Sequence, residues 1–215
     1  MYLANEIVNI IINTLIVCLV STIISFILGV PIGYQIRLRN FKGKKNITRL
    51  LWTLNGMPPV LAGLFIYLLF SNRGPFGSLN LLFTKSIMII AQIVLILPVS
   101  TMYTYSLLKN LNIVVDNLAY LGIDKLQKYL KLISEFRREL TYIFIFSFSE
   151  AISEVGAVMI VGGNIQGETR VLTTAIVFEV SKGEFLNAFI LGVILLIISY
   201  IINSTLFYLQ GDVFD

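Results

Sequence analysis

The sequence contains no histidine, and its one cysteine, Cys18, lies inside an apolar run. A disulfide bond within one chain and the usual Cys/His metal sites are therefore excluded. Charge is equally scarce, because 13% of the 215 residues are Asp, Glu, Lys or Arg, about half the roughly 25% of soluble domains. So few charges cannot cover a globule with polar surface, which indicates that lipid is the solvent for much of the chain. We interpret Cys18 as a small apolar residue of a helix.

Apolar residues, in contrast, make up 57% of the chain. Five stretches have about 20 residues or more, enough at 1.5 Å per residue to cross a hydrocarbon core of about 30 Å. They lie at 7–30, 50–70, 86–108, 139–162 and 186–209. The first is not typical of a cleaved signal peptide, since no basic residue precedes it and no small-x-small site follows. The sequence predicts an all-α membrane protein with about five transmembrane helices in a single domain, 1–215.

The basic residues alternate between crowded and sparse connections. The connections after the first and third stretches hold 12 of the 16 Lys and Arg residues. Because cytoplasmic loops carry the excess of basic residues, the N-terminus is predicted outside and the C-terminus in the cytoplasm. The net charge is +4, and the basic residues lie between the apolar runs. We therefore interpret these residues as a topology signal and not as a nucleic-acid site.

The connection at 109–138 is too long for a simple turn in a compact protein. Apolar residues recur there at roughly helical spacing: Leu118, Leu121, Leu126, Tyr129, Leu130 and Ile133. The pattern predicts one or two short amphipathic helices on the cytoplasmic side. Such a helix either lies on the lipid surface or docks on a partner, and the pattern favours neither.

Pro58 and Pro59 interrupt the second stretch just after Asn55 and Gly56. Proline lacks the N–H that a helix interior uses and clashes with the preceding turn. In a membrane such a break persists where protein or water satisfies the freed backbone groups. The break is therefore either a non-helical segment beside a transport pathway or a kink for packing.

Glu150 and Glu154 lie four residues apart in the fourth stretch, so they share a helix face. Carboxylates within a membrane are costly and normally face a bundle interior or a water-filled cavity. No histidine, metal set or activated nucleophile accompanies them, which makes an enzyme a weak hypothesis. They either bond to neighbouring helices or organise a gate, because they would repel an anionic cargo.

A glycine-rich segment, VGGNIQG at 161–167, follows on the predicted outer side. It resembles a phosphate-binding loop superficially, but the pattern G-x-x-x-x-G-K-[ST] is absent, so the chain carries no Walker A motif and is not itself the ATPase. The next residues, 169–177, are predicted to form a short external helix. Arg170 would meet an anion, a partner's carboxylate or plain solvent.

One long block carries a family resemblance: EAISEVGAVMIVGGNIQGETRVLTTAI at 150–176 closely resembles the tungstate-type ABC importer permeases. Three shorter segments are similar to the same family, namely GMPPVLAGL at 56–64, SNRGPFG at 71–77 and, more weakly, AQIVLILP at 91–98. The similarity covers most of the chain from about residue 50 onward.

The resemblance implies a type I ABC importer permease fold in a prokaryotic cell membrane. Two copies of the chain would form the pathway, two separate ATPase subunits would bind ATP and Mg, and an extracytoplasmic oxyanion-binding protein would deliver the cargo. No cofactor is expected in this chain. Tungstate and molybdate are tetrahedral dianions of nearly equal size, so family likeness alone favours tungstate.

The resemblance also assigns candidate site residues. Such permeases carry an E-A-A-x-x-x-G motif for coupling to the ATPase, and the candidate coupling residues here are Asp116, Ala119, Gly122 and Ile123. The acidic Asp116 and Gly122 match the first and last positions of the motif, whereas Asn117 and Leu118 stand where the motif has its two alanines. The gate or pathway residues are Pro58, Pro59, Glu150, Glu154, Gly156, Asn164, Gly167, Thr169 and Arg170. The competing hypothesis is an ion-coupled transporter or channel that uses Glu150 and Glu154 as proton or cation sites.

Overall fold

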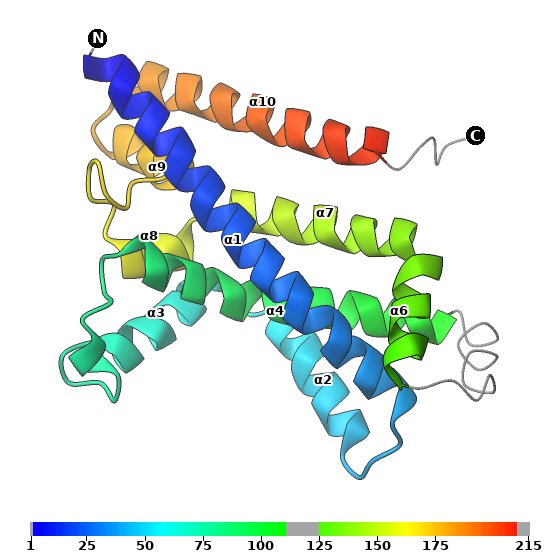
Figure 1. The fold of residues 1–215 in the computed structure, drawn as a ribbon. Helices are drawn as coiled ribbons and strands as arrows, with labels where there is room; N and C mark the ends of the chain where they lie inside the picture. The colour runs from blue at the N-terminus through cyan, green and yellow to red at the C-terminus, as the bar shows by residue number, and fades with distance from the viewer. Residues whose placement is uncertain (1, 111–124, 210–215) are drawn as a thin grey trace.

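The structure is a computed structural model that describes residues 2–110 and 125–209, and every regular element in these ranges is a helix (Figure 1). The elements in chain order are α1 (Tyr2–Leu38), α2 (Lys44–Asn55), α3 (Pro59–Phe70), the short 3₁₀ turn η1 (Gly77–Leu79), α4 (Lys85–Asn110), α6 (Lys125–Glu135), α7 (Arg137–Ser153), α8 (Gly156–Gly162), α9 (Leu172–Ser181) and α10 (Phe185–Leu209).

The central contact of the bundle joins α1 to α4, and Figure 1 shows α1 crossing in front of α4 and α7. One face of α1 has a small residue at every fourth position: Ser21, Ser25, Gly29 and Gly33. A Cβ atom added to Gly33 would lie 2.5 Å from the backbone oxygen of Thr101, and one added to Gly29 would lie 2.7 Å from the Cβ of Ser100. Small residues at this spacing allow membrane helices to approach backbone to backbone.

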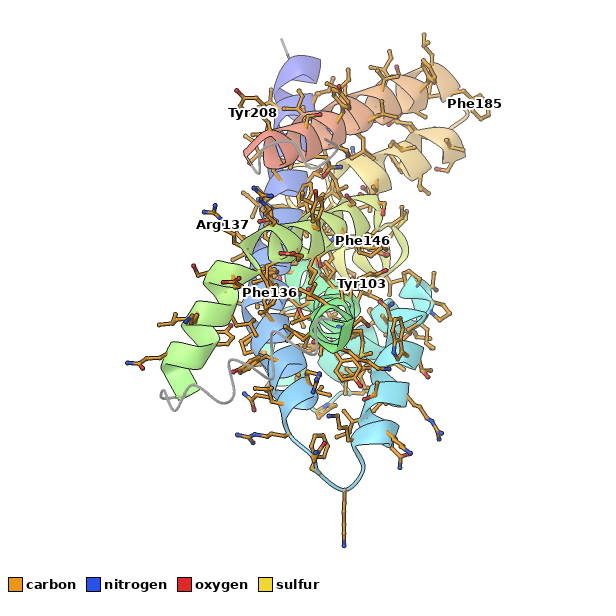
Figure 2. The ribbon with its side chains drawn as sticks, turned by 90° about the vertical axis from the view of Figure 1, so that its right-hand side faces the viewer. Tyr103, Phe136, Arg137, Phe146, Phe185 and Tyr208 are labelled. Carbon is orange, nitrogen blue, oxygen red and sulfur yellow. The ribbon has the colours of Figure 1, made fainter. Side chains whose placement is uncertain are left out.

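Buried apolar side chains form a cluster at each end of this contact. One cluster joins Ile66 of α3, Met88 of α4 and Val158 of α8. Another joins Val30 of α1 to α4 and α6 through Leu108 and Leu132. The rings of Tyr103 and Phe146, 4.7 Å apart between centroids, add a contact between α4 and α7 (Figure 2).

The final helix, α10, lies at the edge of the bundle beside α9 and α7. Its end residues Phe185 and Tyr208 are 68% and 87% exposed, and Figure 2 shows them at opposite ends of the helix. Its apolar residues are exposed over most of its length, which is the surface that a membrane helix presents to lipid.

The five predicted spans correspond to three continuous helical spans and two bent pairs. The continuous spans are Glu6–Leu38, Lys85–Lys109 and Phe185–Thr205. Helices α2 and α3 meet at 102°, and α7 and α8 meet at 56°, so five spans result if each pair is counted as one. The bend between α2 and α3 falls at the interruption predicted at Pro58 and Pro59, whereas the break between α7 and α8 within 139–162 was not predicted. The 12 residues of α3 rise about 18 Å, short of the hydrocarbon core.

Two shorter predictions are corrected in detail. The helix expected at 169–177 is α9, and it begins at Leu172 because residues before it form the loop that returns from α8. The amphipathic helix expected within 109–138 is α6 where the structure describes it. Its most buried side chain is Leu132, at 1% exposed, whereas the predicted face residue Leu130 is 55% exposed.

The α1–α4 contact predicts that Gly33→Ala destabilises the protein. The added methyl group meets a backbone oxygen that cannot rotate away, and overpacking of this kind costs about 1–3 kcal/mol. Gly192→Ala on α10 is the matched control, because a Cβ there meets no atom within 4 Å, and alanine favours a helix over glycine by roughly 0.5–1 kcal/mol. Denaturant unfolding in detergent, followed by helical circular dichroism, measures both. Equal midpoints for the two variants would contradict the contact.

Candidate functional site

Two helix breaks lie on opposite sides of a small cavity. One separates α2 from α3 at Gly56–Pro58, and the other separates α7 from α8 at Glu154 and Val155. The cavity measures about 70 Å³, and residues of both breaks and of α4 line it, among them Asn55, Met57, Pro59, Gln92, Glu150 and Glu154. Residues of two candidate spans far apart in sequence are thus brought to one place.

The break between α2 and α3 follows from the two prolines. Pro59 is the first residue of α3, where a helix makes no use of the N–H that proline lacks. The carbonyl of Pro58 accepts hydrogen bonds from the N–H groups of Leu61 (2.9 Å) and Ala62 (3.3 Å). The predicted interruption is confirmed, and it turns the chain through 102°.

Glu154 ends α7 and caps the start of α8. Its Oε1 accepts a hydrogen bond of 2.7 Å from the N–H of Ala157, one of the N–H groups that the first turn of a helix leaves unpaired. Its backbone carbonyl accepts a 2.9 Å hydrogen bond from the hydroxyl of Thr173 in α9. The carboxylate therefore fixes the bend between the two half-helices.

Glu150 lies one turn earlier, on the last part of α7, and its side chain is exposed. Both glutamates border the same cavity, but Glu154 lies beyond the last residue of α7, so the two do not share a helix face as predicted. Within the residues that the structure describes, no three Cys, Asp or Glu side chains gather closely enough to hold a metal ion. Two carboxylates beside a cavity repel an anion. A bound cation, a proton on one carboxylate or a movement of the side chains would weaken that repulsion.

Glycines bring α3 and α8 into direct contact beside the break. A Cβ on Gly63 would lie 2.6 Å from the Cα of Ala157, and one on Gly156 would lie 2.8 Å from Cγ2 of Val60. Helices α3 and α8 consequently pack backbone to backbone. Helix α8 therefore supports the break before α3, and α3 supports the break before α8.

Gln92 of α4 compensates the break in α7. Because the helix stops, the carbonyl of Ala151 has lost its usual partner four residues on, and Gln92 Nε2 donates a 2.9 Å hydrogen bond to it. The amide oxygen of Gln92 accepts from the hydroxyl of Ser21 at 2.7 Å, and the Cys18 thiol lies 3.5 Å from the same carbonyl. Gln92 is 2% exposed and links α1, α4 and α7.

The loop between α8 and α9 is held from within by Thr169. Its hydroxyl donates to the carbonyl of Gly162 and accepts a 2.9 Å hydrogen bond from the N–H of Ile165. Asn13 of α1 holds the same loop, donating to the carbonyls of Glu168 (3.1 Å) and Arg170 (3.2 Å). Thr169, 1% exposed, thus shapes the loop from inside.

Asn164 and Gly167 supply the unusual backbone of this loop. Their φ angles are +52° and +79°, in the left-handed region that glycine and asparagine tolerate best. A Cβ on Gly167 would meet no atom within 4 Å, so its conformation and not its surroundings favours glycine. These residues lie at the far end of α8 from Glu154, and the predicted gate residues therefore form two groups joined by α8.

Arg170 is paired within the chain and does not meet plain solvent. Its guanidinium contacts Oε1 of Glu6 in α1 at 2.9 Å and lies 4.8 Å from the ring centre of Phe178. The side chain is 11% exposed. It therefore ties the N-terminal turns of α1 to the loop and to α9.

The predicted coupling residues Asp116, Ala119, Gly122 and Ile123, with the whole motif at 116–122, lie outside the described residues. The following helix, α6, packs on the bundle through Leu132, and the Tyr129 ring lies 5.4 Å from that of Tyr34 in α1.

Sequence reasoning missed Gln92 as a functional residue and the small residues of α1 altogether. The recurrence of small residues at every fourth position, Ser21, Ser25, Gly29 and Gly33, predicts a close helix contact and could have been recognised from the sequence. Gln92 was harder to recognise. A lone amide in an apolar stretch indicates that the side chain has a hydrogen-bonding partner but does not identify that partner.

No family model matches the chain, whereas individual relatives cover most of it. It is 42% identical to the tungstate uptake system permease protein TupB of Peptoclostridium acidaminophilum, over 85% of this chain and 81% of that protein. The corresponding TupB of Campylobacter jejuni is 35% identical over 76% of this chain and 69% of its own length. A probable anion ABC transporter permease protein of Haloferax volcanii is 36% identical over 82% and 78%.

These identities cover 76 to 85% of the chain, shares too large for a single common motif. The chain is an integral membrane protein, and it belongs to the family of tungstate uptake system permeases.

Proposed function

We propose that the chain is the membrane permease subunit of an ATP-binding-cassette importer for an oxyanion, with tungstate as its substrate. The observation that carries this proposal is the 42% identity to a tungstate uptake system permease over most of both chains. Molybdate or a related oxyanion is the alternative substrate. The ion-coupled hypothesis has less support, because the relatives are named as parts of uptake systems and ABC transporters.

The working assembly would contain two copies of this chain, two ATPase subunits that bind ATP and Mg, and an extracytoplasmic oxyanion-binding protein. The sequence has no Walker A pattern, so hydrolysis belongs to a separate chain and this one is a transport subunit. The distribution of Lys and Arg supports an external N-terminus and a cytoplasmic C-terminus. A type I importer permease fold in one domain, 1–215, accords with the bent helical pairs.

The gate in this proposal lies at the cavity between the two breaks. Glu150 and Glu154 carry like charge to a tungstate dianion, so they are better suited to controlling passage than to binding the cargo. Glu154 holds α8 through Ala157, and α8 packs on α3 through glycine. A small rotation at Glu154 would therefore move both half-helices and change the opening between them.

The coupling step would use the cytoplasmic connection that contains Gly122. ATP binding draws the two ATPase subunits together, and the connections at 109–138 follow them and open the external side. The cycle works because each ligand binds the two states with different affinity. The packing of Leu132 against Val30 and Leu108 supports this route, since it joins α6 to α1 and α4.

Deletion of the chain should lower tungsten accumulation severalfold in cells given tungstate and molybdate at equal, limiting concentrations. Elemental analysis of washed cells measures both metals, and re-expression of the chain is the control. A selective fall in molybdenum would move the assignment to molybdate. Unchanged uptake of both metals would overturn the oxyanion proposal.

Glu154→Ala should lower tungstate uptake about fivefold, because loss of a helix cap costs about 1 kcal/mol. Glu154→Gln keeps an oxygen that accepts from Ala157 and should retain uptake within about twofold. Glu184→Gln, at an exposed position that does not line the cavity, is the matched control for loss of charge. Equal loss in both Glu154 variants would show that the charge matters and the cap does not.

Gly122→Leu should leave ATP hydrolysis running while tungstate uptake falls, because the bulky side chain disturbs docking on the ATPase subunit. The measurement is ATPase activity and uptake in the same reconstituted vesicles. Ser134→Leu, an exposed residue of α6, is the control. Normal uptake by Gly122→Leu would count strongly against coupling at this residue.

A further inference from the structure

A second, larger hollow lies away from the cavity between the breaks. It has a volume of about 550 Å³ and runs between the N-terminal turns of α1, the α8–α9 loop, α9 and the start of α10. We refer to it as the α1–α9–α10 groove. Its size falls within the range of small-molecule sites, and Figure 1 shows these four segments side by side at one end of the bundle.

Two candidate spans, identified by length and composition, begin beside the groove, at Glu6 and at Phe185. The ends of such spans lie where lipid headgroups meet the hydrocarbon layer. The wall on α10 includes Ile190, 45% exposed, and the buried Leu191. The groove therefore reaches the exposed side of α10, and its lining combines charged and apolar side chains.

Two opposite-charge pairs form the polar rim. Arg170 pairs with Glu6 at 2.9 Å, and Lys182 pairs with Glu179 at 2.8 Å. The carboxylates are largely buried, at 21% and 15% exposed, whereas Lys182 is 47% exposed. Two positive and two negative groups give a rim without net charge, so an isolated anion gains no attraction from it.

The aromatic ring of the groove, that of Phe178, already contacts two cationic side chains. Arg170 and Lys182 both lie over Phe178, at 4.8 and 4.7 Å from the ring centre. A quaternary ammonium is recognised by free aromatic faces, and those of Phe178 are shared by two cations. A primary ammonium, in contrast, has N–H donors that match the carboxylates of Glu6 and Glu179.

From this combination we propose that the α1–α9–α10 groove binds the headgroup of a zwitterionic ethanolamine phospholipid. The phosphate lies against Lys182 and Arg170, the ammonium lies against Glu179 and Glu6, and one acyl chain follows Ile190 along α10. On binding, each charged side chain of the rim replaces its present ion-pair partner with the lipid phosphate or ammonium of opposite charge. A zwitterion therefore enters without leaving a buried charge unpaired.

The test uses native mass spectrometry of the purified chain in detergent. Phosphatidylethanolamine, phosphatidylglycerol and phosphatidylcholine with identical acyl chains are titrated separately. The ethanolamine lipid should bind most tightly, because the other two lack an ammonium with N–H donors. Equal binding of all three lipids would overturn the proposal, and preference for phosphatidylglycerol would replace it with an anion site.

Matched variants place the site. Glu179→Gln and Lys182→Gln should each weaken ethanolamine-lipid binding about fivefold, the scale of one partly exposed ion pair. Glu184→Gln, an exposed glutamate between α9 and α10, should not. Glu179→Gln should also leave phosphatidylcholine binding unchanged. Unaltered ethanolamine-lipid binding in the Glu179 and Lys182 variants would show that the headgroup binds elsewhere.

A steric pair tests the apolar wall independently of charge. Ile190→Trp fills the groove and should abolish specific binding, whereas Ile197→Trp adds the same bulk at an exposed position of α10 that does not line the groove. Helical circular dichroism confirms that both variants fold. Equal lipid binding by the two variants would contradict occupation of the groove.

Discussion

The hydrogen bond from the Gln92 amide to the Ala151 carbonyl is the interaction on which the centre of this protein depends. A helix that ends inside a membrane bundle frees backbone groups that have no water to turn to, and each one left unpaired costs several kcal/mol. Gln92 gives the Ala151 carbonyl at the end of α7 a second donor, beside the 3.3 Å hydrogen bond from the N–H of Glu154. The Glu154 carboxylate accepts from the first turn of α8. The Thr14 hydroxyl accepts from the N–H of Leu172 at the start of α9 in the same way. The bends exist because neighbouring helices supply these partners.

Helix α1 is the support for this arrangement. Its small residues let α4 approach closely, and that proximity places Gln92 between Ser21 and the end of α7. Near its N-terminus, Asn13 holds the loop that leads into α9. A helix that reads as an ordinary apolar span thus positions both groups of candidate gate residues. The polar side chains in its middle, among them Asn13, Thr14 and Ser21, are buried against the bundle, because the lipid offers them no hydrogen bonds.

The sequence predicted those features that depend on local composition. Length and apolarity located the membrane helices, and Pro58 and Pro59 located a break. The spacing of Glu150 and Glu154 predicted a shared helix face, which the end of α7 at Ser153 removes. The bend of 102° was not predictable, because proline ends a helix without setting the direction of the next one. That direction comes from Gly63 and Gly156, which pack α3 against α8. Leu132, and not Leu130, faces the bundle for the same reason, since periodicity finds an apolar side but packing chooses its centre.

The bond between the Thr173 hydroxyl and the Glu154 carbonyl closes a ring of the chain, joining residues 19 positions apart. Helix α8 and its return loop lie within that ring and are braced internally by Thr169. These bonds leave α8 and its loop little freedom to bend independently of Glu154. If the cavity is the gate, as proposed above, a displacement of the loop at the surface would reach Glu154 with little loss to bending along α8.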